Sequence, residues 1–414
     1  MRTLAILVGG GPAPGINAAI AAAAIEARNR GLRVIGCYDG FRWLAAGDTS
    51  HVVELEVHSV STIHFEGGSI IRTSRTDATR KPGAFARVAE ALERLGVNHL
   101  MTIGGDGTAY TASRIADVMP ALTIAHIPKT IDNDLPLPGD LVTFGFTTAC
   151  NLGKDLVRNL MQDAKTTERW FFVTVMGRQT GHLALGIGGA AAATLTVIPE
   201  EFAAPRITMD HLAGIIEGAI IKRRALGREY GVAILAEGLA EKLGPETLGQ
   251  VERDPVGHVR FTELELGRAV RDRVTASLAA RGLRRTIVAK ELGYELRSAA
   301  PGAYDIQYSR SLGYWATRFL LEGGTGAMIT IQGGRFVPIP FTEMLDPETG
   351  RTRVRRVDVS AESYQTLWAY MIRLKPEDFE DPAALASIAK AGHLTETELV
   401  SRFRPLVEPP PGLK

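Results

Sequence analysis

The stretch HLMTIGGDGTAY, residues 99–110, joins an apolar run to a cluster of three glycines around one aspartate. A second apolar run, LTIAHI (122–127), is followed in the same way by PKTIDND (128–134). A strand that leads into glycines and acidic residues, and then into a helical pattern, is typical of α/β sheets, where ligands bind beyond the carboxyl ends of the strands. The two segments therefore predict two strands that end at one functional site.

The same alternation of apolar runs and helical patterns continues on both sides of this stretch, and it predicts a doubly wound parallel sheet. The chain has 414 residues, which is too long for one ordinary domain, so two α/β domains are expected. The further predicted strands are 3–8, 33–39, 170–177, 194–200 and 230–238, and the predicted helices are 15–31, 83–96 and 147–167.

Composition excludes several classes of protein. A net charge of +1 argues against binding to a nucleic acid backbone, and the basic clusters KRR (222–224) and RTRVRR (351–356) are expected to be solvated surface. The two cysteines, Cys37 and Cys150, have no disulfide or zinc pattern and indicate a reducing, cytoplasmic compartment. The longest uncharged stretch, 183–198, is too short to span a membrane and predicts a buried helix that leads into a strand.

The loop GGGPAPG (9–15), between a predicted strand and a helix, permits two interpretations. Its glycines allow a phosphate to approach the backbone at a helix N-terminus. As a loose dinucleotide fingerprint with Asp39 on the ribose, it would indicate an NAD(P)-dependent oxidoreductase. Pro12 and Pro14 remove amide donors where a pyrophosphate would need them, and a simple tight turn also explains the loop.

The acidic loops suit phosphoryl transfer better. Asp106, among glycines at a predicted helix start, suits a Mg²⁺ ion shared with a phosphate chain, although a helix N-cap is the structural alternative. Asp132 and Asp134 lie two residues apart, so in an extended strand end they face the same side. One carboxylate would accept the proton of an attacking hydroxyl, whereas a plain Asp–Asn–Asp turn is the alternative. No GxxxxGK[ST] motif is present, which excludes a P-loop kinase.

Three later segments also follow apolar runs. MGRQTGH (176–182) places Arg178 at a glycine turn that suits an anion, Glu237 could hold sugar hydroxyls, and LGYELR (292–297) offers a tyrosine and an arginine. Each of these segments alone is more often structural than functional.

Taken together and in this order, the motifs resemble those of the 6-phosphofructokinase family. The matching segments run from residue 9 to about residue 305, and they are GGGPAPGIN, GGSIIRTSR, GGDGT, PKTIDND, MGR, AEG and LGYELR. The resemblance implies a Mg²⁺-dependent cytoplasmic enzyme of glycolysis that phosphorylates fructose 6-phosphate at its 1-hydroxyl, as a homo-oligomer (tetramer or dimer). It leaves open a related acceptor such as sedoheptulose 7-phosphate, or a catalytically inactive sugar-phosphate sensor.

The resemblance also implies two Rossmann-like domains with the active site in the cleft between them. Residues 1–145 and about 296–345 would bind the phosphoryl donor. Residues 146–295 and about 346–414 would bind fructose 6-phosphate and carry a C-terminal extension.

The roles of individual residues follow from the resemblance alone. Asp132 would be the general base, and Asp106 would hold Mg²⁺. The other catalytic residues would be Thr130, Asp134 and Lys129, and the donor site would be lined by Gly11, Arg75, Gly105, Asp106, Gly107 and Thr108. The substrate would contact Thr130, Asp132, Met176, Gly177, Arg178, Glu237, Tyr294 and Arg297, and Arg169 would reach the sugar phosphate bound by a neighbouring subunit.

Some positions depart from the pattern of the family. Tyr294 stands where many bacterial members have histidine, and Arg72 replaces a glycine of the donor loop. Val288 stands where an arginine usually binds the sugar phosphate, with Lys290 or Arg285 as substitutes. These departures affect the expected binding of the 6-phosphate and not the expected chemistry.

The donor depends on two positions that point in opposite directions. In the family, an aspartate at the position of Gly107 marks pyrophosphate users, since it would lie where the α-phosphate of ATP must go. Two like charges ~4 Å apart cost about 4 kcal/mol at an effective dielectric constant of ~20. Glycine removes that obstacle, so ATP is the expected donor. Lys129 is typical of pyrophosphate users, which makes pyrophosphate the alternative.

Overall fold

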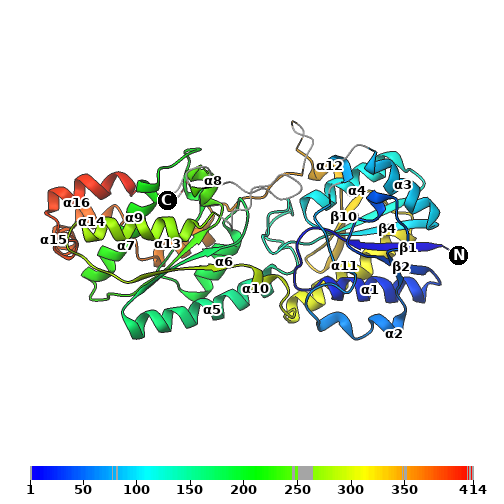
Figure 1. The fold of residues 1–414 in the computed structure, drawn as a ribbon, viewed down its shortest axis with the longest axis horizontal. Coiled ribbons are helices and arrows are strands. Elements are labelled where there is room, and N and C mark those ends of the chain that lie inside the picture. Colours follow the sequence, from blue (N-terminus) through cyan, green and yellow to red (C-terminus); the bar gives the residue numbers. More distant parts are fainter. Residues whose placement is uncertain are drawn as a thin grey trace. The chain divides into compact units, whose positions relative to one another are not determined.

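The computed structural model describes residues 2–76, 78–80, 83–244, 248–249, 264–346, 348, 352–407, 409 and 412. The chain divides into two compact units. The first holds the described residues of 1–149 and 294–355, and the second holds those of 150–293 and 356–414. Each is built on a sheet with helices packed against it (Figure 1).

The first unit contains a seven-stranded sheet in the order β11-β10-β5-β4-β1-β2-β3. The five inner strands run parallel, and the two edge strands are antiparallel to their neighbours. In this order the strands are Arg335–Pro340, Ala327–Gln332, Thr123–Pro128, Val97–Gly104, Thr3–Val8, Arg33–Cys37 and Val52–Glu54.

Helices cover both faces of this sheet (Figure 1). Side chains of β1 explain why, because Leu4, Ile6 and Val8 belong to one apolar core and Ala5 and Leu7 to another. A strand buried on both faces is typical of a doubly wound parallel sheet. One core includes α1 (Ile16–Asn29) and α11 (Ala303–Leu321), and the other includes α3 (Ala84–Arg94) and α4 (Asp106–Val118). The short helices of this unit are α2 (Val57–Val60), α10 (Tyr294–Arg297) and α12 (Phe341–Met344).

The second unit contains a four-stranded parallel sheet in the order β7-β8-β6-β9. These strands are Leu195–Val197, Gly231–Ala236, Trp170–Val175 and Ile287–Leu292. Helix α5 is Phe146–Thr167, and the later helices are α6 (His182–Ala191), α7 (Met209–Ala225), α8 (Leu239–Leu243), α9 (Leu266–Ala279), α13 (Glu362–Tyr370), α14 (Glu377–Glu380), α15 (Pro382–Ala391) and α16 (Glu396–Phe403). Among the residues that the structure describes, 3₁₀ turns include Leu44–Ala46, Ile63–Phe65, Ala78–Arg80, Pro199–Glu201 and Arg404–Leu406.

The predicted architecture of two doubly wound, Rossmann-like units is confirmed, and each strand and helix expected from the sequence is present within a few residues of its predicted bounds. The uncharged stretch 183–198 forms α6 and β7, as expected. Within the described part of the chain, no helix is both long enough and apolar enough to span a membrane.

The prediction that KRR (222–224) is a solvated face is wrong. Lys222 donates to Asp378 Oδ2 at 2.7 Å and to the Arg373 carbonyl at 3.0 Å. Arg224 forms an ion pair with Glu229 and donates to the Ala391 carbonyl at 2.6 Å. These cations hold the C-terminal helices against α7, because they satisfy carbonyl and carboxylate oxygens that the helices bring there.

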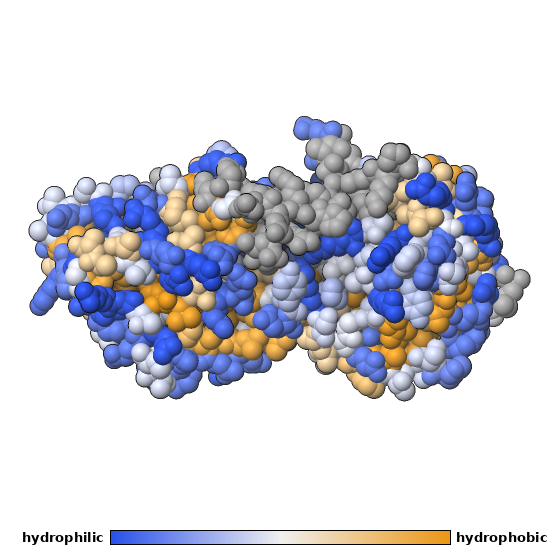
Figure 2. Space-filling view, viewed as in Figure 1, coloured by the Kyte–Doolittle hydropathy of each residue, from blue (hydrophilic) through white to orange (hydrophobic). Residues whose placement is uncertain are grey.

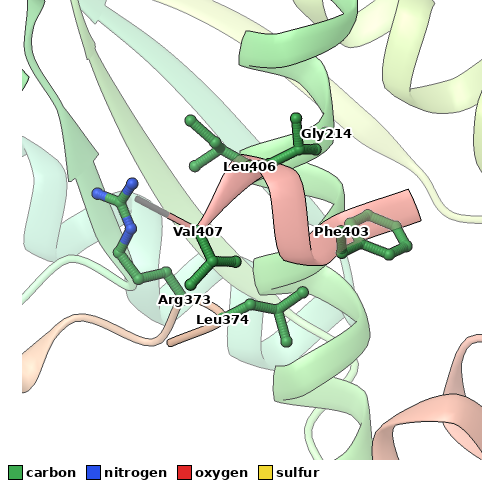
Figure 3. Close-up of a pocket in the computed structure, with 7 residues that line it drawn as sticks. Gly214, Arg373, Leu374, Phe403, Leu406 and Val407 are labelled. Carbon is green, nitrogen blue, oxygen red and sulfur yellow. The ribbon is translucent and has the colours of Figure 1, made fainter. Parts of the chain in front are cut away.

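The C-terminal helices add an apolar cluster to the second unit. Phe403, Leu374 and Ile388 are buried together with Ile221 of α7. Figure 3 shows Leu406 beside Gly214 of α7 and Val407 beside Leu374, and these residues line a cavity of about 10 Å³. A cavity of this volume has room for about one water molecule, so it is no ligand site. Figure 2 shows hydrophilic and apolar residues intermixed on the visible surface of both units.

Candidate active site

Three loops of the first unit follow adjacent parallel strands. β5, β4 and β1 are neighbours in the sheet, and they lead into residues 129–134, 104–108 and 9–15. Because parallel strands end at the same edge of a sheet, the glycine loop and both acidic loops converge there. The structure thus brings together the predicted donor and catalytic segments of the first unit.

The glycine loop is held by its neighbours through the main chain. Gly9 N donates to the Ile103 carbonyl, and Gly10 N donates to the Ser74 carbonyl, each at 2.9 Å. A Cβ atom on Gly9 would clash with Thr108 Oγ1, so only glycine allows this approach. The segment that carries Arg75 therefore runs beside the loop that carries Gly11.

Lys129 lies under the glycine loop. Its side chain is buried, and Nζ donates to the Gly9 carbonyl at 2.8 Å and to the Gly11 carbonyl. A Cβ atom on Gly10 would lie 3.2 Å from Nζ. The lysine therefore places its positive charge at the loop where a phosphate would bind.

The TIDND loop leaves the extended conformation at its centre. Asn133 has a φ of 58°, in the left-handed region, so the strand alternation expected for Asp132 and Asp134 does not apply. Thr143 N donates to Asn133 Oδ1 at 3.1 Å, and Thr143 Oγ1 donates to the Thr130 carbonyl at 2.6 Å. Asp132 and Asp134, on either side of Asn133, are both largely buried.

Asp106 begins α4, directly after Gly105, which is the N-cap residue. A Cβ atom on Gly107 would meet no atom within 4 Å, so this position faces open space. Among the described residues, no group of three His, Cys, Asp or Glu side chains could hold a metal ion. A single carboxylate still suits Mg²⁺, which is commonly bound by one or two carboxylates together with substrate phosphates.

A buried histidine lies beneath these loops. His126 of β5 contacts Thr102 Oγ1 through Nδ1 at 2.8 Å and the Gly104 carbonyl through Nε2 at 3.0 Å. Burial lowers the pKa of His126 to about 3, so the ring is neutral near pH 7. It supports the carbonyl that precedes Gly105 and Asp106.

In the second unit, adjacent strand ends bring Glu237 to the MGR turn. Glu237 Oε1 accepts from Gly177 N at 3.1 Å and from Arg178 N at 2.6 Å. Both residues have positive φ values, 154° for Gly177 and 53° for Arg178, so the carboxylate stabilises a turn of unusual conformation. Met176, at the start of the turn, is buried against Gly293.

Arg297 lies in the first unit, beside the glycine loop. A Cβ atom on Gly11 would lie 3.6 Å from Arg297 Cζ, and the guanidinium lies 5.1 Å from the centre of the exposed Tyr294 ring. Arg169 precedes β6, whereas Met176 follows it. The six-residue strand therefore separates them by ~20 Å within one chain.

Asp39, the ribose ligand of the oxidoreductase alternative, has other partners. Trp43 Nε1 donates to Asp39 Oδ2 at 2.9 Å, and Arg72 Nη1 lies 3.8 Å from the same atom. The Asp39 carboxylate therefore already has two partners within the protein. Arg285, one suggested substitute for a sugar-phosphate arginine, forms an ion pair with Glu229.

The sequence interpretation missed several residues that hold the loops. Asp305 of α11 accepts from Gly145 N at 2.8 Å and from Thr148 N at 2.7 Å, and burial raises its pKa. Arg355, in a cluster expected to be solvated, donates to the Asn133 carbonyl of the TIDND loop and to the Leu141 carbonyl. These partners are 157–222 residues apart in sequence, so no local sequence pattern predicts the contacts between them.

The comparisons with known proteins agree on one family. The family model described as Phosphofructokinase matches residues 3–320. The chain is 49% identical to the pyrophosphate–fructose 6-phosphate 1-phosphotransferase of Thermotoga maritima, over 92% of this chain and 93% of that protein. It is 46% identical to the protein of the same name from Naegleria fowleri, over 98% and 96% of the two chains.

More distant similarities are consistent with this result. The ATP-dependent 6-phosphofructokinase of Thermotoga neapolitana is 31% identical, over 83% of this chain and 94% of that protein. The solved structure of a pyrophosphate-dependent phosphofructokinase from Marinobacter aquaeolei matches the fold with a TM-score of 0.66 at 15% identity, over 95% and 92% of the two chains. These findings exclude the oxidoreductase interpretation, and the chain belongs to the phosphofructokinase family.

Proposed function

We propose that this enzyme transfers a phosphoryl group from inorganic pyrophosphate to the 1-hydroxyl of fructose 6-phosphate. The observation that carries the proposal is the 49% identity, over nearly the whole chain, to a protein named for that reaction. The products are fructose 1,6-bisphosphate and orthophosphate.

This proposal replaces the expected donor. The prediction of ATP rested on Gly107, which faces open space and so presents no obstacle to an α-phosphate. An absent obstacle supplies no binding energy for ATP, so glycine there does not select a donor. Lys129 supports pyrophosphate, because a lysine at this position is typical of the pyrophosphate users of the family. The relative named for ATP is also less similar, at 31% identity.

We assign the chemistry to the acidic loops of the first unit. Asp132 accepts the proton of the 1-hydroxyl as its oxygen attacks phosphorus, and Lys129 stabilises the charge on the transferred group. Thr130 and Asp134 contact the sugar or the transferred group. Asp106 would hold a Mg²⁺ ion, which would neutralise charge on the donor phosphates.

We assign substrate binding by the resemblance to the family. The donor would contact Gly11, Arg75, Gly105, Gly107 and Thr108. Fructose 6-phosphate would contact Met176, Gly177, Arg178, Glu237, Tyr294 and Arg297. Arg169 would complete the sugar-phosphate site of a neighbouring subunit, so the active form would be a homo-oligomer (a tetramer or a dimer).

The donor is tested by measuring kcat/KM with pyrophosphate and with ATP at saturating fructose 6-phosphate and Mg²⁺. We expect at least a tenfold preference for pyrophosphate. A preference for ATP would overturn the donor assignment, and no turnover with either donor would overturn the proposed reaction.

The Gly107→Asp variant provides a matched control. It should keep its activity with pyrophosphate and lose most residual activity with ATP, since a carboxylate ~4 Å from the α-phosphate costs about 4 kcal/mol. Unchanged kinetics with ATP in this variant would show that position 107 does not face the α-phosphate.

A further inference from the structure

Arg355 lies in a segment that the family model does not cover, since that match ends at residue 320. The segment follows α12 and belongs to the first unit. The Arg355 guanidinium donates to the Asn133 carbonyl at 3.2 and 3.1 Å and also to Asn133 Oδ1. It donates to the Leu141 carbonyl at 2.6 Å, and its own main-chain N donates to the Asp134 carbonyl at 2.9 Å.

These contacts surround the residue between the two carboxylates. Asn133 has a left-handed backbone, which for a residue other than glycine persists only where its surroundings hold it. Its side-chain oxygen accepts from both Arg355 and Thr143 N, and its carbonyl accepts two further bonds from Arg355. The arginine therefore fixes Asn133, and with it the direction in which the chain carries Asp132 and Asp134.

The same segment also reaches the second acidic loop. Thr352 lies three residues before Arg355, and its Oγ1 donates to the Asp106 carbonyl at 3.4 Å. Residues 352–355 thus contact the backbone of both loops that carry the proposed catalytic and metal-binding carboxylates.

We propose that Arg355 is a positioning residue that holds the 130–134 loop in its catalytic arrangement. The inference rests on the proposed function of Asp132 as general base. Arg355 acts through Asn133, whose carbonyl and side-chain oxygen accept hydrogen bonds from its guanidinium. A displacement of ~1 Å in a catalytic group can cost about 10²-fold in rate, so loss of this anchor should lower kcat rather than raise KM.

The geometry requires a guanidinium. The planar guanidinium donates to the Asn133 carbonyl and to the Leu141 carbonyl at the same time. The ammonium group of a lysine carries its three donors on one atom and cannot span both. Burial lowers the pKa of Arg355, opposed by the nearby Asp134, Tyr308 and Asp140, but an arginine remains charged near pH 7. Lysine should therefore be a poor replacement.

The experiment compares Arg355→Ala and Arg355→Lys with Arg353→Ala. Arg353 is an exposed arginine of the same segment, and its side chain donates to the Glu343 carbonyl, away from the loop. Arg355→Ala should lower kcat about 10²-fold with KM for fructose 6-phosphate within a few-fold, and Arg355→Lys should recover little of the loss. Arg353→Ala should match the wild type.

Two further measurements separate positioning from general stability. Millimolar guanidinium chloride should restore part of kcat in Arg355→Ala, and it should leave Arg353→Ala unchanged. Hydrogen–deuterium exchange should increase in the peptide that covers residues 129–145 of Arg355→Ala, with exchange elsewhere unchanged. If Arg355→Ala does not fold, the kcat of Arg355→Lys and the exchange of its residues 129–145 decide.

Two outcomes would overturn the inference. One is a wild-type kcat in both Arg355 variants. The other is a loss of activity that guanidinium does not restore, together with raised exchange throughout the first unit. Hydrogen–deuterium exchange also separates a failure of the proposed reaction from a failure of the proposed anchoring by Arg355. If the wild type shows no activity with either donor, the proposed function fails, and unchanged exchange at residues 129–145 in Arg355→Ala would refute the anchoring independently.

Discussion

Asp132 is the side chain on which the proposed proton transfer depends. General-base catalysis typically contributes 10²–10⁴-fold. Asp132→Asn should therefore lower kcat by at least about 10²-fold and leave KM for fructose 6-phosphate within a few-fold, because the amide keeps the shape of the carboxylate. Steady-state kinetics of this variant, beside Asp117→Asn on the exposed surface of α4, test the assignment. A variant that retains half of the wild-type rate would rule out Asp132 as the base.

His126 links the stability of the first unit to pH. Burial lowers its pKa in the folded chain from 6.5 to about 3, so below pH 6.5 the unfolded chain binds this proton and the folded chain does not. This part of the stability is complete above pH 6.5 and is lost as the pH falls toward 3, with a slope of up to ~1.4 kcal/mol per pH unit. His126→Asn should remove this slope from the free energy of unfolding, measured by urea denaturation at several pH values. An unchanged slope, equal to that of the exposed His58→Asn control, would contradict the prediction.

Among the elements, α1 and α11 depend on small residues for their close packing. A Cβ atom on Gly313 would clash with the Ala19 carbonyl, and Thr317 Oγ1 donates to the Ala23 carbonyl at 3.2 Å. Gly313→Ala should therefore destabilise the protein by about 1–3 kcal/mol, although alanine favours an isolated helix. Thermal unfolding measures the change against Ser311→Ala, since Ser311 is only partly buried on the same helix. A higher Tm for Gly313→Ala would show that the helices can separate at little cost.

The sequence predicted the elements well because their signals are local. The apolar runs at 3–8, 99–103, 122–127 and 170–177 all became strands, each followed by a loop with glycine or acidic residues. The conformation inside those loops was less predictable. At Asn133, hydrogen bonds from the main-chain N of Thr143 and from the distant Arg355 override the strand alternation.

For the molecule as a whole, the C-terminal helices belong to the core of the second unit. Phe403 is buried against Leu374 and α7, and Figure 3 shows it at the end of α16. Phe403→Ala should lower the free energy of unfolding by about 3–5 kcal/mol. Tyr370→Ala is the control, because its side chain is 80% exposed. Chemical denaturation of both variants gives the comparison, and equal stabilities would show that these helices add nothing to the core.

Two sheets, the glycine loop and both acidic loops can be read from the chain alone, because the spacing of apolar residues and the placement of glycine and aspartate act over a few neighbouring residues. The family followed from the order of those motifs. The identity of the phosphoryl donor did not follow from the sequence, since a glycine at position 107 shows only that there is space for an α-phosphate. The anchors of the site, Arg355 on Asn133 and Asp305 on Thr148, join residues 222 and 157 positions apart. Folding alone brings such partners together, because buried carbonyl and amide groups must find hydrogen bonds wherever the packed chain supplies them.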